Sequence, residues 1–163
     1  MPISCNTGAY KPCLNGMIEF RLTIDSRITR AVHPLISKCF ADCVKVEGPV
    51  FPSLEDFDSD FIKTWEHSLN DDFSQDRHSL ARLFNDPKFA HGYIALPNEE
   101  IEQVLRGLTE VRLFVRESHL NDFTDDELEN GEFHLEDKPS VAQSYYLSYI
   151  VLAEIQEGLI ARL

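Results

Sequence analysis

The first regular pattern along the chain is an alternation of apolar and polar side chains between Met17 and Ile24. The apolar positions are every second residue, namely Ile18, Phe20, Leu22 and Ile24. Because successive side chains of a β-strand point to opposite faces, this alternation predicts a strand over residues 17–24 with one buried face. A shorter alternation over residues 92–96 predicts a second strand, which we expect to pair with the first.

Most of the remaining chain follows the helical period, with apolar residues three and four positions apart. Asp25 or Ser26 can cap the first such segment, which ends near Lys45. Further helices are predicted over about 53–73, 76–84 and 98–120 and from Ser140 onward, with a short capped turn at 124–127. The expected fold is therefore mostly α (α+β): a single compact helical domain over residues 17–163, with about five helices and a two-stranded β-ribbon formed by residues 17–24 and 92–96.

Residues 1–16 differ from this regular part, since they mix proline and glycine with small polar residues. We expect a flexible leader there. The leader has no apolar region of the kind that a secretory signal needs, so a cytoplasmic location is expected. No apolar run in the sequence approaches the roughly 18 to 20 residues of a membrane span, and we expect no membrane contact.

The net charge narrows the choice of partner. Fifteen basic residues against 28 acidic ones give a formal charge of −13. A field of that sign repels phosphate backbones, so direct binding of nucleic acid is not expected. If the protein affects transcription, it should do so through a protein partner, and a basic one such as a sigma factor or polymerase fits this charge best.

The spacings of the common enzyme classes are missing from the sequence. Its seven glycines form neither a GxGxxG nor a P-loop pattern, and it contains no GxSxG or HExxH. We therefore expect a non-enzymatic regulatory or adaptor protein that acts through protein contacts and needs no cofactor. The alternative is a small-molecule or metal-binding domain, or an enzyme of unfamiliar type.

Cys39 and Cys43 are the sharpest local feature for chemistry. Four residues apart on a helix, their Cβ atoms lie about 5 to 6 Å apart, whereas a relaxed disulfide needs about 3.8 Å. A bridge would therefore distort the helix, as a redox switch requires, although both cysteines can equally pack as small apolar residues. Cys5 and Cys13 fall in the leader, where they are candidates for reactive thiols, or for joining Cys39 or Cys43 in a metal site or bridge.

Three further patterns allow a functional and a structural interpretation. Phe57, Phe61 and Trp65 could line a ligand pocket, but a stripe at helical spacing is also typical of core. The acidic run of residues 122–137 lacks the order of an EF-hand loop, which favours a solvated capping segment over a calcium site. The last helix carries two apolar stripes, and the second could contact the first helix or a second copy in a homodimer.

Two stretches near the C-terminus carry a family resemblance. Residues 107–127 read GLTEVRLFVRESHLNDFTDDE and residues 149–163 read YIVLAEIQEGLIARL. These stretches resemble the bacterial AosR (oxidative-stress regulator) family, formerly a domain of unknown function, mainly over roughly the last 65 residues. The resemblance implies a regulatory role, which the Cys39 and Cys43 pair would suit, and it implies no catalytic residue.

Overall fold

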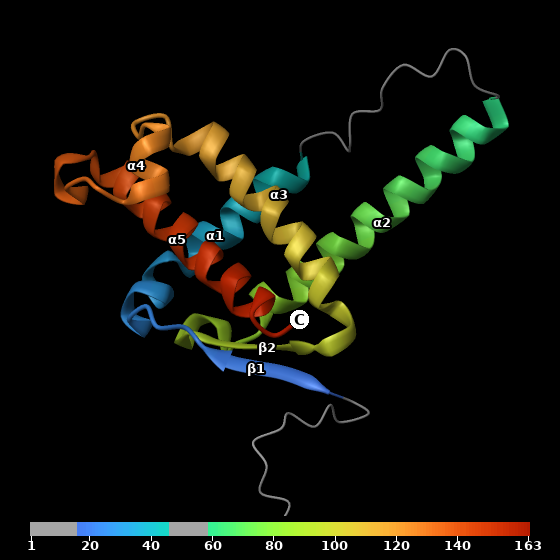
Figure 1. Cartoon of the computed structure of the whole chain (residues 1–163), viewed down its shortest axis with the longest axis horizontal. Coiled ribbons are helices and arrows are strands. Elements are labelled where there is room, and N and C mark those ends of the chain that lie inside the picture. The colour runs from blue at the N-terminus through green and yellow to red at the C-terminus, as the bar shows by residue number, and fades with distance from the viewer. Residues whose placement is uncertain (1–15, 46–58) are drawn as a thin grey trace, which may run out of the picture.

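The computed structural model describes residues 16–45 and 59–163, with the side chains of the helix that begins at Ser59 described at 60, 63 and from 74 onward. Within these ranges the chain forms five α-helices and one two-stranded sheet, so the mostly helical fold class is confirmed (Figure 1). The elements are β1 (Met17–Arg21), α1 (Ser26–Lys45), α2 (Ser59–Asn85), β2 (Tyr93–Pro97), α3 (Ile101–His119), α4 (Asp125–Asn130) and α5 (Ser140–Ile160), with short 3₁₀ turns at Phe89–His91, Asn98–Glu100 and Leu135–Asp137.

The two strands pair antiparallel, with Ile18 opposite Leu96 and Phe20 opposite Ile94. β1 ends at Arg21 and not near Ile24, so the predicted first strand is too long. The reason is that the backbone N–H groups that follow find other acceptors. The N–H of Leu22 still donates to the carbonyl of Gly92 across the ribbon, but those of Thr23 and Ile24 donate to the Glu154 carboxylate on α5.

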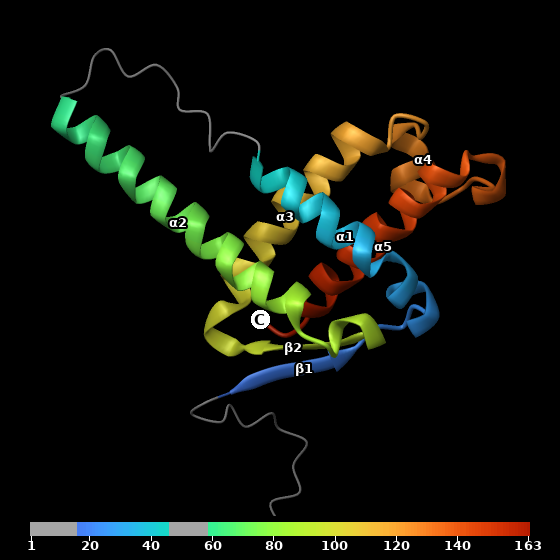
Figure 2. The same ribbon diagram turned by 180° about the vertical axis from the view of Figure 1, so that it is seen from behind.

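The main core lies where α1, α3 and α5 meet above the ribbon (Figures 1 and 2). Ile36 of α1, Leu108 of α3 and Leu152 of α5 are each fully buried. Burial of one such side chain contributes about 1.5 to 3 kcal/mol of transfer free energy. The helical stripes of the sequence therefore correctly predicted the elements that bury the core.

α2 is one continuous helix, which corrects the prediction of two helices over 53–73 and 76–84. The second predicted segment begins at Asp76, which continues the helix and contacts α3. Asp76, whose side chain is 9% exposed, forms an ion pair with Arg106 of α3 at 2.9 Å. Gly107 lets the two helices approach closely, since a Cβ there would lie 3.1 Å from Cδ2 of Leu80.

Two predicted helix ends have different outcomes. The helix predicted over about 98–120 begins later than expected, because Asn98–Glu100 form a 3₁₀ turn and α3 begins at Ile101 without a side-chain cap. The capping box of α4 is confirmed, because Thr124 accepts from the N–H of Glu127 and the Glu127 carboxylate accepts from the N–H of Thr124. Gly131 ends α4 with φ 64°, a conformation that favours glycine.

α5 divides its apolar side chains between the core and the surface. Tyr145, Leu152 and Leu159 are buried, whereas the side chains at both ends of the helix, Val141 and Ile160, are 69% and 54% exposed. The described residues therefore do not cover both predicted stripes along their whole length. The homodimer remains a prediction, because the structure contains one copy.

Candidate functional site

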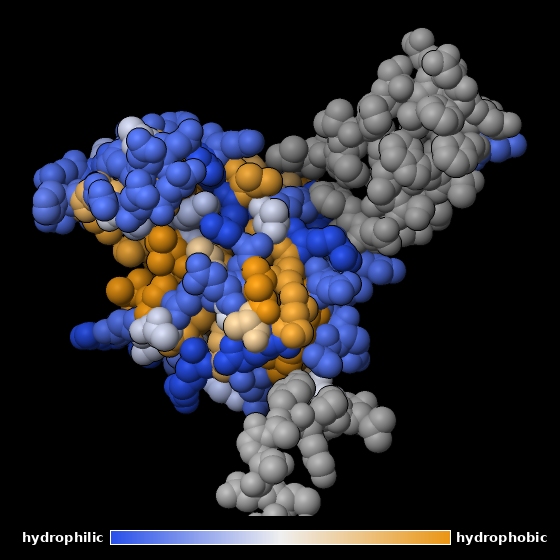
Figure 3. Space-filling model, viewed as in Figure 1, coloured by the Kyte–Doolittle hydropathy of each residue, from blue (hydrophilic) through white to orange (hydrophobic). Residues whose placement is uncertain are grey.

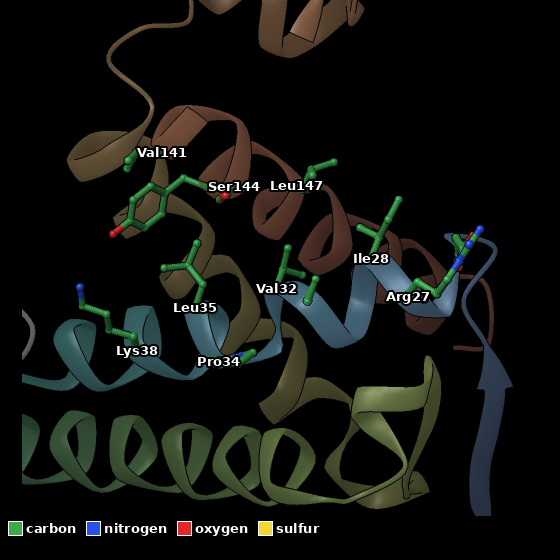
Figure 4. A pocket seen from close by; sticks show the side chains of 12 residues that line it. Arg27, Ile28, Val32, Pro34, Leu35, Lys38, Val141, Ser144 and Leu147 are labelled. Carbon is green, nitrogen blue, oxygen red and sulfur yellow. Dashed lines mark hydrogen bonds and ion pairs between the residues drawn. The ribbon is translucent and has the colours of Figure 1, made fainter. Parts of the chain in front are cut away.

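An open groove lies between α1 and the first half of α5 (Figure 4). Its volume is about 870 Å³. The lining is mostly apolar and consists of Asp25, Arg27, Ile28, Ala31, Val32, Pro34, Leu35, Lys38, Val141, Ser144, Tyr145 and Leu147. We call this feature the α1/α5 groove.

Helical spacing explains why these side chains gather. On α1, Ile28, Ala31 and Leu35 lie three and four residues apart, so they share one face of the helix. Val141 and Tyr145 repeat the same spacing on α5. Part of this face is covered, since Val32 is 5% exposed, while Ala31 and Val141 remain open to solvent. The groove can therefore bury an apolar segment from outside the described part of the chain.

The two ends of the groove differ in charge. At the α1 start, Arg27 forms an ion pair with Asp25 at 2.8 Å, and its hydrogen bonds lower the pKa of that carboxyl to about 2. Lys38 lies at the other end of the groove, which is also the end of Val141 (Figure 4). The Tyr145 ring stacks on His119 at 3.9 Å between centroids. Burial, assisted by Lys38, lowers the pKa of His119, so this ring is a neutral packing partner at pH 7.

Residues 121–138, which we call the acidic lobe, border the groove at the Val141 end. They contain eight carboxylates and one lysine, a net charge of −7. In Figure 3 the hydrophilic surface of the α4 region meets an apolar area at the left of the molecule. The acidic lobe thus carries −7 of the net charge of −13, more than half, in one short segment directly before α5.

Aromatic packing holds the acidic lobe against α5. Phe123 stacks on Tyr146 of α5 with centroids 5.1 Å apart, and Phe133 meets the same ring edge-on at 5.1 Å. Lys138 donates to the carbonyl of Asp122 at 2.8 Å and forms an ion pair with Glu127 at 2.9 Å. The predicted solvated capping segment is thus an ordered part of the fold, with a fixed position relative to the groove.

Cys39 and Cys43 both face the core, where they are 1% and 4% exposed. Burial raises the pKa of Cys39 to about 11. Burial and the neighbouring Glu110 carboxylate raise the pKa of Cys43 to about 12, and its thiol donates to Glu110 at 3.4 Å. Because the thiolate is the reactive form, these surroundings favour core packing over redox chemistry.

The structure describes none of the other predicted site residues at the groove. Cys5, Cys13 and Phe57 lie outside the described residues, and Phe61 and Trp65 belong to α2 at positions whose side chains are not described. Within the described residues no three histidine, cysteine or acidic side chains are grouped to hold a metal ion. Over the same ranges no helix is long and apolar enough to cross a membrane.

The α1/α5 groove was not predicted from the sequence. Its α1 side chains belong to a stripe that was interpreted as core, and burial along a stripe depends on what covers it. One signal was present in the last helix, whose two apolar stripes together exceeded what a single neighbouring helix needs.

Comparisons with known proteins found no match to a family model, to a curated protein or to a solved structure. The function is therefore inferred from the geometry and chemistry of the groove and its border.

Proposed function

We propose that this protein is a non-enzymatic regulatory or adaptor protein of the cytoplasm, and that it binds a segment of a protein partner in the α1/α5 groove. The observation that carries the proposal is an apolar groove that the described chain leaves uncovered. Contiguous apolar surface rimmed by polar residues marks interaction sites in soluble proteins. Val141, a lining residue that is 69% exposed, belongs to that surface.

The shape of the groove favours a helix as the bound segment. The lining residues of α1 span 27–38, which is a length of roughly 16 Å or three helical turns. A partner helix that places apolar side chains at i, i+3 or i+4 and i+7 would fill such a site, as amphipathic helices do in the grooves of other proteins. The polar groups at the α1 start are already paired with each other, so they do not demand a polar ligand.

The resemblance of residues 107–127 and 149–163 to the AosR family supports the regulatory part of the proposal, and membership of that family is itself proposed on those residues. The redox-responsive form of the proposal gains no support from Cys39 and Cys43, because both thiols are buried with raised pKa values. The proposed mechanism is therefore docking without thiol chemistry.

Two alanines on α1 offer a matched test. Ala31 lines the groove and Ala41 does not, and both are exposed. Affinity capture from the native cytoplasm should recover the same partner with the wild type and with Ala41→Glu, and lose it with Ala31→Glu. A partner retained by Ala31→Glu would contradict the groove as its docking site. A tight, salt-sensitive shift of bare DNA by the protein would contradict the proposal as a whole.

A small-molecule binder is the second candidate, and the size of the groove favours it. Ligand pockets commonly enclose about 300 to 1,000 Å³ with mostly apolar lining, and this groove lies in that range. Native mass spectrometry of the protein from its own cytoplasm separates the two. A stoichiometric small molecule that Ala31→Glu releases would favour this candidate over protein docking.

A further inference from the structure

We infer that the segment that binds the α1/α5 groove is a basic amphipathic helix, whose apolar face fills the groove and whose lysines and arginines lie along the acidic lobe. This inference rests on the proposed function and specifies the chemistry of the partner. It combines the uncovered groove with the charge that borders it.

The acidic lobe and the groove are joined through the chain itself. The lobe ends at Lys138, and Val141 at the groove end follows three residues later. Val141 and Lys38 mark this end of the groove in Figure 4. A helix that lies in the groove and continues past Val141 would therefore pass beside the lobe.

Most of the carboxylates of the lobe are available to such a partner. Asp125 forms an ion pair with Arg116, and Glu127 forms one with Lys138. The other six are exposed and form no ion pair with lysine or arginine among the described residues: Asp122, Asp126, Glu129, Glu132, Glu136 and Asp137. Exposed carboxylates repel each other where they lie within about one Debye length, which is about 8 Å in physiological salt, and a cationic partner would relieve that repulsion.

The position of these charges is fixed before binding. Phe123, Phe133 and Tyr146 form the aromatic contacts that hold the lobe on α5, and Lys138 ties its two ends together. A preorganised surface loses less conformational freedom on association than a mobile one. The lobe can therefore contribute to affinity as well as attract the partner over a distance.

The cations at the groove do not reverse this preference. Arg27 is neutralised by Asp25 at the far end. Lys38 remains near the lobe end, and its single positive charge is outnumbered by the six exposed carboxylates of the lobe. A helix with acidic flanks would meet net repulsion there, and a basic one would meet net attraction.

A displayed library of helical peptides tests the inference directly. The peptides keep an apolar residue at each i, i+3, i+4 and i+7 position and carry lysine or glutamate with equal chance at the flanking positions. Selection uses the immobilised full chain. A triple variant, Glu129→Gln/Glu132→Gln/Asp137→Asn, removes three lobe charges. A control variant, Glu99→Gln/Glu102→Gln/Glu157→Gln, removes three exposed charges outside the lobe. Glu99 and Glu102 lie around the start of α3, whereas the lobe follows the other end of that helix.

The expected result is enrichment of lysine over glutamate at the flanks by at least about threefold, lost when Ala31→Glu is the target. An enriched peptide should bind the lobe triple variant about three- to tenfold more weakly and the control variant less than about twofold more weakly. Enrichment of neutral or acidic peptides that still require Ala31 would overturn the basic partner and leave groove docking intact. Equal weakening by both triple variants, or no enrichment that depends on Ala31, would also overturn the inference. The capture experiment tests groove docking separately.

Discussion

The Glu154 carboxylate on α5 accepts hydrogen bonds from both the backbone N–H and the hydroxyl of Thr23, although the two residues are 131 positions apart in the chain. The hydroxyl contact is 2.6 Å long, and the same carboxylate also accepts from the N–H of Ile24. One acidic side chain thus ends β1 and fixes the turn that leads into α1. Because α1 and α5 form the two walls of the groove, this contact also sets how they lie relative to each other.

Substitution Glu154→Ala should lower the free energy of unfolding by about 1 to 3 kcal/mol, since it leaves two backbone donors without their acceptor. Chemical denaturation measures the effect. Glu157 is exposed and lies about one helical turn further along α5. Glu157→Ala should therefore change the free energy of unfolding by less than about 0.5 kcal/mol. Equal effects of the two substitutions would show that the Thr23 contact contributes nothing specific.

Gly158 and Phe20 provide a test of how closely α5 approaches β1. A Cβ at position 158 would lie 2.4 Å from Cε2 of Phe20, so Gly158→Ala should cost about 1 to 3 kcal/mol through overpacking. Replacing the ring by a smaller side chain should remove the conflict. In a double-mutant cycle, Gly158→Ala should therefore cost less than about 1 kcal/mol in the Phe20→Leu background. An unchanged cost in that background would contradict the close approach.

The pH dependence of stability should reveal the two buried thiols. Their pKa values of about 11 and about 12 lie above the ordinary value near 9, so between these limits the unfolded chain releases protons that the folded chain keeps. The stabilisation of the folded state is complete below about pH 9 and decreases as the pH rises toward the folded-state values. The unfolding free energy of the wild type should thus fall more steeply above pH 9 than that of Cys39→Ala/Cys43→Ala. Parallel pH profiles would contradict the assigned pKa shifts.

The same burial predicts slow thiol chemistry in the native protein. At pH 8, modification of Cys39 and Cys43 by a thiol reagent should proceed only at the rate at which the protein opens, and it should be fast in denaturant. Peroxide should leave both thiols free, as measured by peptide mass spectrometry. A Cys39–Cys43 bridge with loss of helix by circular dichroism would instead revive the redox switch predicted from their spacing.

Lys138 should control the order of the acidic lobe. Lys138→Met removes the hydrogen bond to the Asp122 carbonyl and the ion pair with Glu127, so amide exchange in α4 should become faster. Lys88→Met, at an exposed loop position, serves as the control and should leave that exchange unchanged. Unaltered exchange in both variants would mean that the aromatic contacts alone hold the lobe.

Local patterns predicted the elements well, and contacts distant in sequence explain where they failed. The alternation at residues 17–24 and the stripe that includes Ile36 correctly predicted a strand and a helix, because side-chain period follows backbone geometry. The end of β1 involves Glu154 of α5, and within the continuous α2 Asp76 pairs with Arg106 of α3. A local window of the sequence contains neither partner. The groove was missed for the same reason, since the pattern around Ala31 does not say which part of an apolar face remains uncovered.

Site-specific photo-crosslinking in the native cytoplasm tests groove docking most directly. A photoreactive amino acid is placed at Ala31, in the groove, and in a second protein at Ala41, exposed on the same helix outside the groove. Both proteins are irradiated under identical conditions, and the adducts are identified by mass spectrometry. Protein docking predicts one discrete protein adduct at position 31 that is absent at position 41. No protein adduct at position 31, or the same adducts at both positions, would contradict it.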